Sequence, residues 1–208
     1  MSTVLVIRVA KCTFGLVALL SQIASGVSTG SSPAKTDLQG QLISAVAGND
    51  EAGCLRLLHA GAGLNLRDSL GLLPIDVVRS VEMARFLLTR GASPNLKDGT
   101  KFGWRPLEYA AHLERVGVSQ LLIDRGADVN GVDRVGCTAL FAAALRGRDG
   151  EVQFLLKHGA DKSLRDAKGE TALEALRSYE YKHALQFEGL VDRFEKCADL
   201  LSETPLRA

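Results

Sequence analysis

The sequence predicts an all-α solenoid of about five stacked helix–turn–helix repeats, two of them caps, joined by short hairpin-like turns. Two observations predict this fold. A Leu-Leu…Gly-Ala phrase returns four times at a nearly constant spacing, and a second phrase with apolar residues at i, i+3 and i+4 precedes each copy. A pair of short helices cannot bury its apolar face alone, whereas stacked neighbours bury it for one another.

The composition is that of a globular protein and argues against several classes of function. The 208 residues carry 25 Lys and Arg against 24 Asp and Glu, and this balance argues against general nucleic-acid binding. Four cysteines are too few for a disulfide scaffold. Apolar residues make up 46% and charged residues 24% of the chain, which is typical of a folded rather than a disordered protein.

The N-terminal segment predicts an export signal. It lacks acids, carries positive charge at Arg8 and Lys11, and continues into a short apolar run. Small residues at Ala24 and Gly26 fit the −3 and −1 positions of a signal peptidase site, with the cut before Val27. A cut one residue upstream, a transit peptide and an uncleaved membrane anchor are the alternatives.

The domain organisation follows from this signal and from the extent of the repeats. We assign residues 1–26 to the signal peptide, 27–36 to a flexible lead-in, 37–202 to the repeat domain and 203–208 to a C-terminal tail. The alternative anchor would cover residues 4–27. The signal predicts an exported protein of the bacterial periplasm, or a secreted one.

Four copies of one phrase define the repeat. They cover residues 57–68, 87–98, 121–133 and 155–166. Their Gly-Ala pairs begin at Gly61, Gly91, Gly126 and Gly159, so successive copies lie 30, 35 and 33 residues apart. We expect each of these glycines to supply the left-handed residue that ends the second helix of its unit.

The phrase before each copy predicts the first helix. It reads Pro-Leu-Glu-Tyr-Ala-Ala over 106–111 and Thr-Ala-Leu-Phe-Ala-Ala-Ala over 138–144. Together the two phrases resemble the ankyrin repeat, over about Leu38 to Leu201. The resemblance implies a non-catalytic fold that binds other proteins, with the turn tips and the inner edge of the first helices along its concave side.

Departures from the family pattern predict local differences. Only 16 residues separate Ile75 from Gly91, against 19 between Leu140 and Gly159, so the first helix of the second unit should be clipped. The third turn, residues 98–106, is the longest. The position usual for His in the family's Thr-Pro-Leu-His box is taken by Asp76, Glu108, Phe141 and Glu174, which puts the usual hydrogen bonds between repeats in doubt.

Both ends of the array are expected to be caps with polar outer faces. The first unit starts at Asp37 without a preceding hairpin, and the last carries an insert over 178–187 before an amphipathic stretch over 190–201. Tyr179, Tyr181 and Phe187 make this insert either a second contact site or part of the cap.

No residue pattern predicts a metal, a cofactor or catalysis. Cys54 and Cys197 fall at inward-facing positions and Cys137 lies near a turn, so we expect reduced thiols. His59 and His158 end second helices, where a cation favours the helix dipole. Neither Cys-x-x-Cys nor His-Glu-x-x-His occurs, and no enzyme activity is expected.

The candidate partner-binding residues lie on the turns and at the ends of the first helices. The third turn is the strongest candidate, because an aromatic residue beside Arg has the composition of an interface hot spot. Trp104 either projects from this turn or folds back to fill the gap beside the clipped unit. The full candidate set is Leu70, Leu72, Lys101, Phe102, Trp104, Arg105, His112, Leu113, Arg134, Val135, Leu145, Arg146, Lys168 and Glu170.

The sequence thus predicts a protein–protein interaction module whose partner is another protein, with no nucleic acid and no small-molecule substrate. Export, small size and a lone binding domain favour an inhibitor or immunity protein of an enzyme that acts in the cell envelope. The alternative is an assembly or stabilising scaffold for an envelope or redox enzyme; a secreted effector is a third hypothesis. The membrane would be contacted only through an uncleaved N-terminal segment.

Overall fold

The computed structural model describes residues 37–183 and 188–202. This part of the chain is helical, and its only bridge between extended segments joins Arg165 and Thr171. The helices are α2 (Leu38–Ala47), α3 (Glu51–His59), the 3₁₀ helix η1 (Pro74–Val77), α4 (Val81–Thr89), α5 (Pro106–His112), α6 (Val116–Asp124), α7 (Ala139–Ala144), α8 (Asp149–Lys157), α9 (Ala172–His183) and α10 (Glu188–Ser202).

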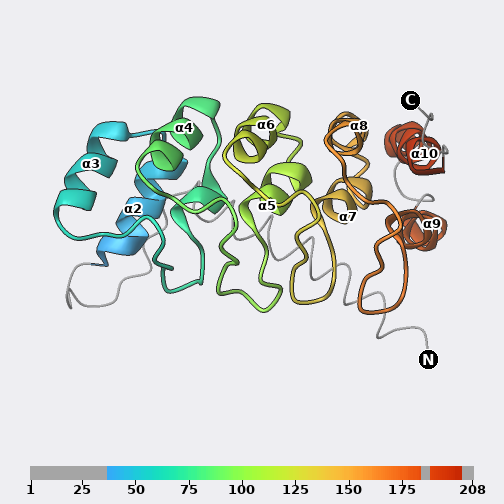
Figure 1. The fold of residues 1–208 in the computed structure, drawn as a ribbon, viewed down its shortest axis with the longest axis horizontal. Helices are drawn as coiled ribbons and strands as arrows, with labels where there is room; N and C mark the ends of the chain where they lie inside the picture. Colours follow the sequence, from blue (N-terminus) through green and yellow to red (C-terminus); the bar gives the residue numbers. More distant parts are fainter. Residues whose placement is uncertain (1–36, 184–187, 203–208) are drawn as a thin grey trace.

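The helices form two layers, and the turns project from one of them (Figure 1). The layer of first helices runs α2, η1, α5, α7, α9, and each member packs against the next. In the layer of second helices, α4 packs on α6, α6 on α8 and α8 on α10. This arrangement confirms the predicted all-α repeat solenoid.

Local sequence explains where the helices begin and end. Asp37, Asp50 and Ser80 cap α2, α3 and α4 by accepting the backbone N–H of the residue three positions on. The glycines of the Gly-Ala pairs follow the second helices with positive φ angles of 84° to 105°, as predicted. A residue with Cβ would be strained there, and this conformation lets the chain leave the helix towards the next turn.

The core is built from small and medium apolar side chains. Ala111, Ala143 and Ala144 are fully buried, which lets the first helices of neighbouring units approach closely. Cys54 and Cys197 are buried as predicted, and burial raises the pKa of the Cys54 thiol to about 11. The cysteines of the described ranges form no disulfide.

The irregular units are also as predicted. The first helix of the second unit is reduced to the single 3₁₀ turn η1. At the C-terminal end, α9 continues into the predicted insert as far as His183, and α10 packs on α7, α8 and α9 with Phe194 and Leu201 buried. The insert residues Tyr179, Tyr181 and Phe187 lie outside the part whose side chains are described.

Ion pairs fasten this terminal helix to the preceding units. Arg193 of α10 pairs with Glu114 after α5 and, at 3.1 Å, with Asp149 at the start of α8. Within residues 37–183 and 188–202, no helix is both long and apolar enough to cross a membrane. The predicted signal peptide, lead-in and tail fall outside these ranges.

A candidate partner-binding surface on the turns

Each turn is organised by one aspartate. The Oδ1 atoms of Asp68, Asp98, Asp133 and Asp166, in the second, third, fourth and fifth turns, accept the backbone N–H two residues further on, at 2.8–2.9 Å. The sequence predicts no such turn before the first unit. The backbone N–H of each aspartate also donates to the carbonyl that closes its turn. This carbonyl lies four residues later in three of the turns, and six residues later, at Trp104, in the third turn. The turns are therefore hairpin-like, and the third is the longest, as predicted.

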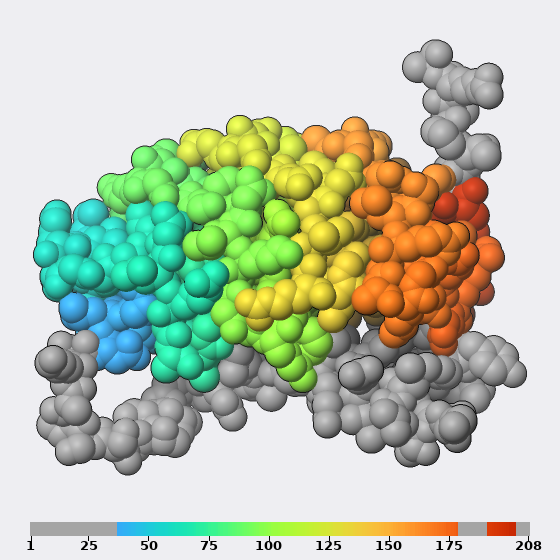
Figure 2. Space-filling model, turned by 60° about the horizontal axis from the view of Figure 1, so that its bottom comes forward, coloured from blue at the N-terminus to red at the C-terminus, as the bar shows by residue number. Residues whose placement is uncertain are grey.

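Neighbouring turn tips are joined by backbone hydrogen bonds. Gly99 N–H donates to the Gly71 carbonyl at 2.6 Å. Arg134 N–H donates to the Phe102 carbonyl and Ala167 N–H to the Val135 carbonyl, both at 2.8 Å. The four tips thus form a continuous ribbon along one side of the solenoid, the side that is turned forward in Figure 2. A surface held in this way loses little conformational entropy when a partner binds.

A ladder of asparagines also links the units. Asn95 Nδ2 donates to the Gly126 carbonyl at 2.7 Å, and its Oδ1 accepts Asp128 N–H at 2.8 Å. Asn65 and Asn130 make the same two bonds to the units that follow them. These bonds join the repeats through residues outside the degraded box, whereas Asp76 and Glu108 of the box bond to the backbone of their own units. The signal was visible as the Asn that recurs four residues after three of the glycines.

Exposed apolar side chains gather on the same ribbon. Leu66, Leu70, Val132 and Val135 are between 37% and 59% exposed, and they are four of the five large apolar residues exposed in the described ranges. The fifth, Leu55, lies on α3. Since apolar groups scattered singly on a surface carry no signal, their concentration on two turns marks this side as the candidate binding surface.

The third turn lies between the turn with Leu66 and Leu70 and the turn with Val132 and Val135, and its two aromatic residues make different contacts. Trp104 is half-buried, and its ring centroid lies 5.1 Å from those of both Tyr109 and His112 on α5. Phe102 is also half-buried, with Lys101 Nζ 4.7 Å from its ring centroid. Trp104 therefore folds back, as in one of the two alternatives, but its ring packs on the first helix of its own unit rather than on the clipped second unit.

Two residues predicted to contact a partner, Leu72 and His112, are buried, so this prediction is wrong for both. The Leu72 side chain points into the core where the second turn returns to η1, and it is fully buried. His112 is 2% exposed because the Trp104 ring covers it. Burial, with the charges of Arg146 and Arg148, lowers the pKa of His112 to about 3. Neither side chain reaches the surface that a partner would contact.

The remaining candidates are accessible. Leu70, Lys101, Arg134, Val135 and Lys168 are exposed. Those that are partly exposed are Arg105, Leu113, Leu145, Arg146 and Glu170, together with Phe102 and Trp104. Arg105 reaches over the fourth turn, where its Nε donates to the Val132 carbonyl at 3.3 Å, so the third and fourth turns present their side chains together.

Sequence inspection did not anticipate a group of buried acids behind the turns. Asp76 and Glu108, two of the residues in place of the usual His, accept the backbone N–H of Leu73 and Arg105 at 2.9 Å. They cap η1 and α5 in this way. Burial raises the pKa of Asp76 well above its usual value, and it raises the pKa of Glu108 to about 9, so Glu108 is neutral at pH 7. The described residues contain no group of three or more His, Cys, Asp or Glu arranged to hold a metal ion.

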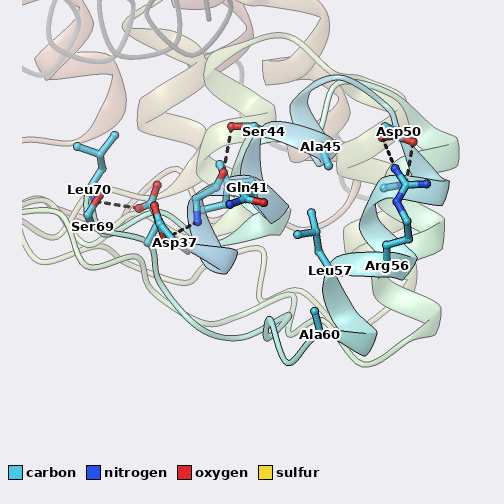
Figure 3. Close-up of a pocket in the computed structure, with 14 residues that line it drawn as sticks. Asp37, Gln41, Ser44, Ala45, Asp50, Arg56, Leu57, Ala60, Ser69 and Leu70 are labelled. Atoms are coloured by element: carbon cyan, nitrogen blue, oxygen red, sulfur yellow. Dashed lines mark hydrogen bonds and ion pairs between the residues drawn. The ribbon is translucent and has the colours of Figure 1, made fainter. Parts of the chain in front are cut away.

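A hollow lies at the N-terminal end of the solenoid. It has a volume of about 840 Å³ and is lined by α2, α3 and the tip of the second turn. Gln41, Ala45 and Leu57 face one another across it, with Arg56 and Asp50 at one side and Leu70 at the other (Figure 3). The hollow belongs to the cap, and Leu70 connects it with the ribbon of turn tips.

Comparisons with known proteins agree with this architecture. The model of a family described as "Ankyrin repeats (many copies)" matches residues 122–175, and the model "Ankyrin repeat" matches residues 102–134.

Similar curated proteins are neurogenic locus notch homolog protein 1 of Mus musculus (37% identical over 121 residues) and of Homo sapiens (36% over 121). Neurogenic locus notch homolog protein 2 of Homo sapiens is 34% identical over 117 residues. These alignments cover 55–57% of the chain but only 5% of each relative.

Proposed function

Because the chain is an all-α ankyrin-repeat solenoid, we propose that it is an exported, non-catalytic module that recognises a partner protein. Ankyrin repeats generally bind other proteins and do not catalyse reactions. The partner would dock on the ribbon of turn tips and the adjacent ends of the first helices. The buried acids Asp76 and Glu108 act as helix caps, which gives these two carboxyl groups a structural role.

One observation supports this site above others. Leu66, Leu70, Val132 and Val135 are exposed on turns that backbone hydrogen bonds hold in register. Such a rigid row of apolar side chains, flanked by arginine and partly exposed aromatics, has the composition of an interface centre. The solvent-facing second helices offer only Leu55 among exposed large apolar residues of the described part.

The more specific role that we propose is inhibition of an enzyme that acts in the cell envelope. The N-terminal sequence features of a signal peptide support export, and a single small binding domain suits an inhibitor or immunity protein. Inhibition requires only that the docked module blocks access to the partner's active site. The module itself does not need to catalyse any reaction.

The experiment is capture of the partner with the full chain, tagged at its C-terminus and expressed in the cell that makes it. Fractionation first places the protein, and the N-terminus of the purified protein identifies any cleavage before Val27. Captured proteins are then compared between the wild type, Leu70→Ser/Val135→Ser and the control Leu55→Ser, whose side chain has an exposure of 36% against 38% for Val135.

We expect an envelope enzyme that is retained by the wild type and the control, lost by the double variant, and inhibited by the purified chain. A partner whose abundance falls when the gene is deleted, without any inhibition, would replace the inhibitor role by that of an assembly scaffold. Retention in the cytoplasm would contradict export, and equal capture by all three variants would contradict the site.

A further inference from the structure

We infer that the turn tips recognise an acidic protein segment in which apolar side chains alternate with the acids. This inference rests on the proposed recognition function and specifies the chemistry of its partner. The whole chain gives no hint of it, since its formal net charge is +1. The preference arises from how the structure distributes charge within the turns.

The acids of the tips are turned inward. Asp98 and Asp133 are buried, and Asp68 and Asp166 are half-buried, because each carboxylate accepts N–H groups of its own turn. A carboxylate engaged in this way is screened from a partner. The exposed acids of the same segments, Asp128 and Asp161, lie near the ends of the second helices rather than at the tips.

The cations of the tips remain outside. Arg67, Lys101, Arg134, Arg165 and Lys168 are all exposed. Arg165 pairs with Glu174 at 2.8 Å and Lys168 with Glu170 at 3.8 Å, whereas Arg67, Lys101 and Arg134 form none of the ion pairs found in the described ranges. Three successive tips therefore each present a cation without a paired carboxylate.

Two of these cations are held in place. Arg67 Nη2 donates to the Lys97 carbonyl at 2.6 Å, and Arg134 Nη1 donates to the Thr100 carbonyl, so both side chains cross onto the third turn. The third turn accommodates them with glycines, since a Cβ at Gly99 or Gly103 would lie within 2.8 Å of these side chains. A guanidinium has five N–H donors, so one bond to a carbonyl leaves others for a carboxylate.

The apolar residues distinguish a protein segment from a nucleic acid. Leu66 and Leu70 flank the cations on one side, and Val132 and Val135 flank them on the other. A phosphate backbone has no apolar group to place against them, and single-stranded bases stack on aromatic rings, of which the tips offer only half-buried Phe102 and Trp104. A peptide that alternates acids with leucine or phenylalanine satisfies both kinds of side chain.

The test uses the full chain and fluorescent peptides of equal length built from Glu-Glu-Leu, Lys-Lys-Leu or Glu-Glu-Ser triplets. Binding is followed by fluorescence anisotropy. We expect the Glu-Glu-Leu peptide to bind at least about tenfold more tightly than either other peptide, and its affinity to fall as NaCl rises from about 0.05 to 0.3 M. A single-stranded oligonucleotide that binds as tightly as the Glu-Glu-Leu peptide would overturn the inference.

Charge-reversal variants test whether the acidic peptide binds at the turn tips. Lys101→Glu/Lys168→Glu changes two tip lysines whose ammonium groups contact only the Phe102 ring and Glu170, so the turns keep their hydrogen bonds. The control, Arg85→Glu/Lys157→Glu, makes the same change in net charge at exposed positions of α4 and α8. We expect the tip variant to weaken Glu-Glu-Leu binding at least about tenfold and the control less than about twofold.

Capture of the partner with both double variants separates the acidic preference from the recognition function. Loss of that partner in both Leu70→Ser/Val135→Ser and Lys101→Glu/Lys168→Glu supports acidic recognition. A partner lost only in the apolar variant overturns the acidic preference and leaves the recognition function standing. A partner retained by both variants overturns the acidic preference and the docking site on the turn tips, since its interface would then lie elsewhere on the solenoid.

Discussion

Tyr109 on the first helix of the third unit donates its hydroxyl hydrogen bond to Asp98 Oδ2 at 2.5 Å. Both residues are buried. Asp98 uses its other oxygen to hold the Thr100 N–H and hydroxyl, so Tyr109 ties the start of the long third turn to the core. The side chains that the turn presents to a partner depend on this contact for their position.

We predict that Tyr109→Phe destabilises the protein by about 1–3 kcal/mol, because Asp98 Oδ2 would lose its buried partner. Urea unfolding at neutral pH measures the loss. The same variant should also weaken partner capture through the third turn. Unchanged unfolding would mean that the carboxylate finds another donor, and the hydroxyl would then have no role in placing the turn.

We predict that Asn95→Ala costs about 1–2 kcal/mol, because it removes two hydrogen bonds between consecutive units. The matched control is Ser163→Ala, at the equivalent position of the last copy, where the Oγ contacts Asp161 two residues earlier rather than a following unit. Its cost should be smaller. If the two substitutions cost the same, the ladder would not couple the units.

The sequence predicted the fold well because the signal is repeated. Each Leu-Leu…Gly-Ala phrase combines a buried helix face with a glycine that adopts a positive φ. Because four copies agree, the fold prediction does not depend on any single copy. The clipped η1 followed from the 16 residues between Ile75 and Gly91, against 19 between Leu140 and Gly159, and the long third turn followed from the length of the segment 98–106. Spacing along a repeat translates directly into helix and turn lengths.

The candidate site was predicted less completely, because its chemistry depends on side-chain direction. Position in the repeat placed Leu72 and His112 near the surface, but the return of the turn buries Leu72, and the Trp104 ring covers His112. Asp98 and Asp133 appear in the sequence as charges that balance Arg and Lys. Only their hydrogen bonds to the turns reveal that the tips are cationic.

We predict that Trp104→Ala and Phe102→Ala separate stability from recognition. Trp104 packs on Tyr109 and His112, so its truncation should cost about 2–4 kcal/mol. Phe102→Ala should cost less than about 1 kcal/mol, because Phe102 lies outside the core cluster, and should instead weaken partner capture. Thermal unfolding and capture are measured for each variant alone. Equal destabilisation by both would show that Phe102 is also structural.

We predict that Glu151→Gln makes stability less dependent on pH between about 4.5 and 7. Burial, and to a smaller extent the charge of Glu114, raises the pKa of Glu151 to about 7, although a hydrogen bond from Ser119 opposes the shift. Over this range the folded protein keeps a proton that the unfolded chain, with a pKa near 4.5, has released. Stability of the wild type therefore falls as the pH rises.

Gln at position 151 cannot titrate, so the variant lacks this pH-dependent destabilisation. It should be more stable than the wild type by about 1–3 kcal/mol at pH 7, and this difference should disappear near pH 4.5. His112 contributes the opposite slope below about pH 6.5, since its pKa is lowered in the folded state, but it does so in both proteins and cancels in the difference. Urea unfolding at several pH values gives that difference, with Glu82→Gln on the exposed face of α4 as the control. A difference that stays constant with pH would show that Glu151 is ionised in the folded protein and that Ser119 stabilises its charge.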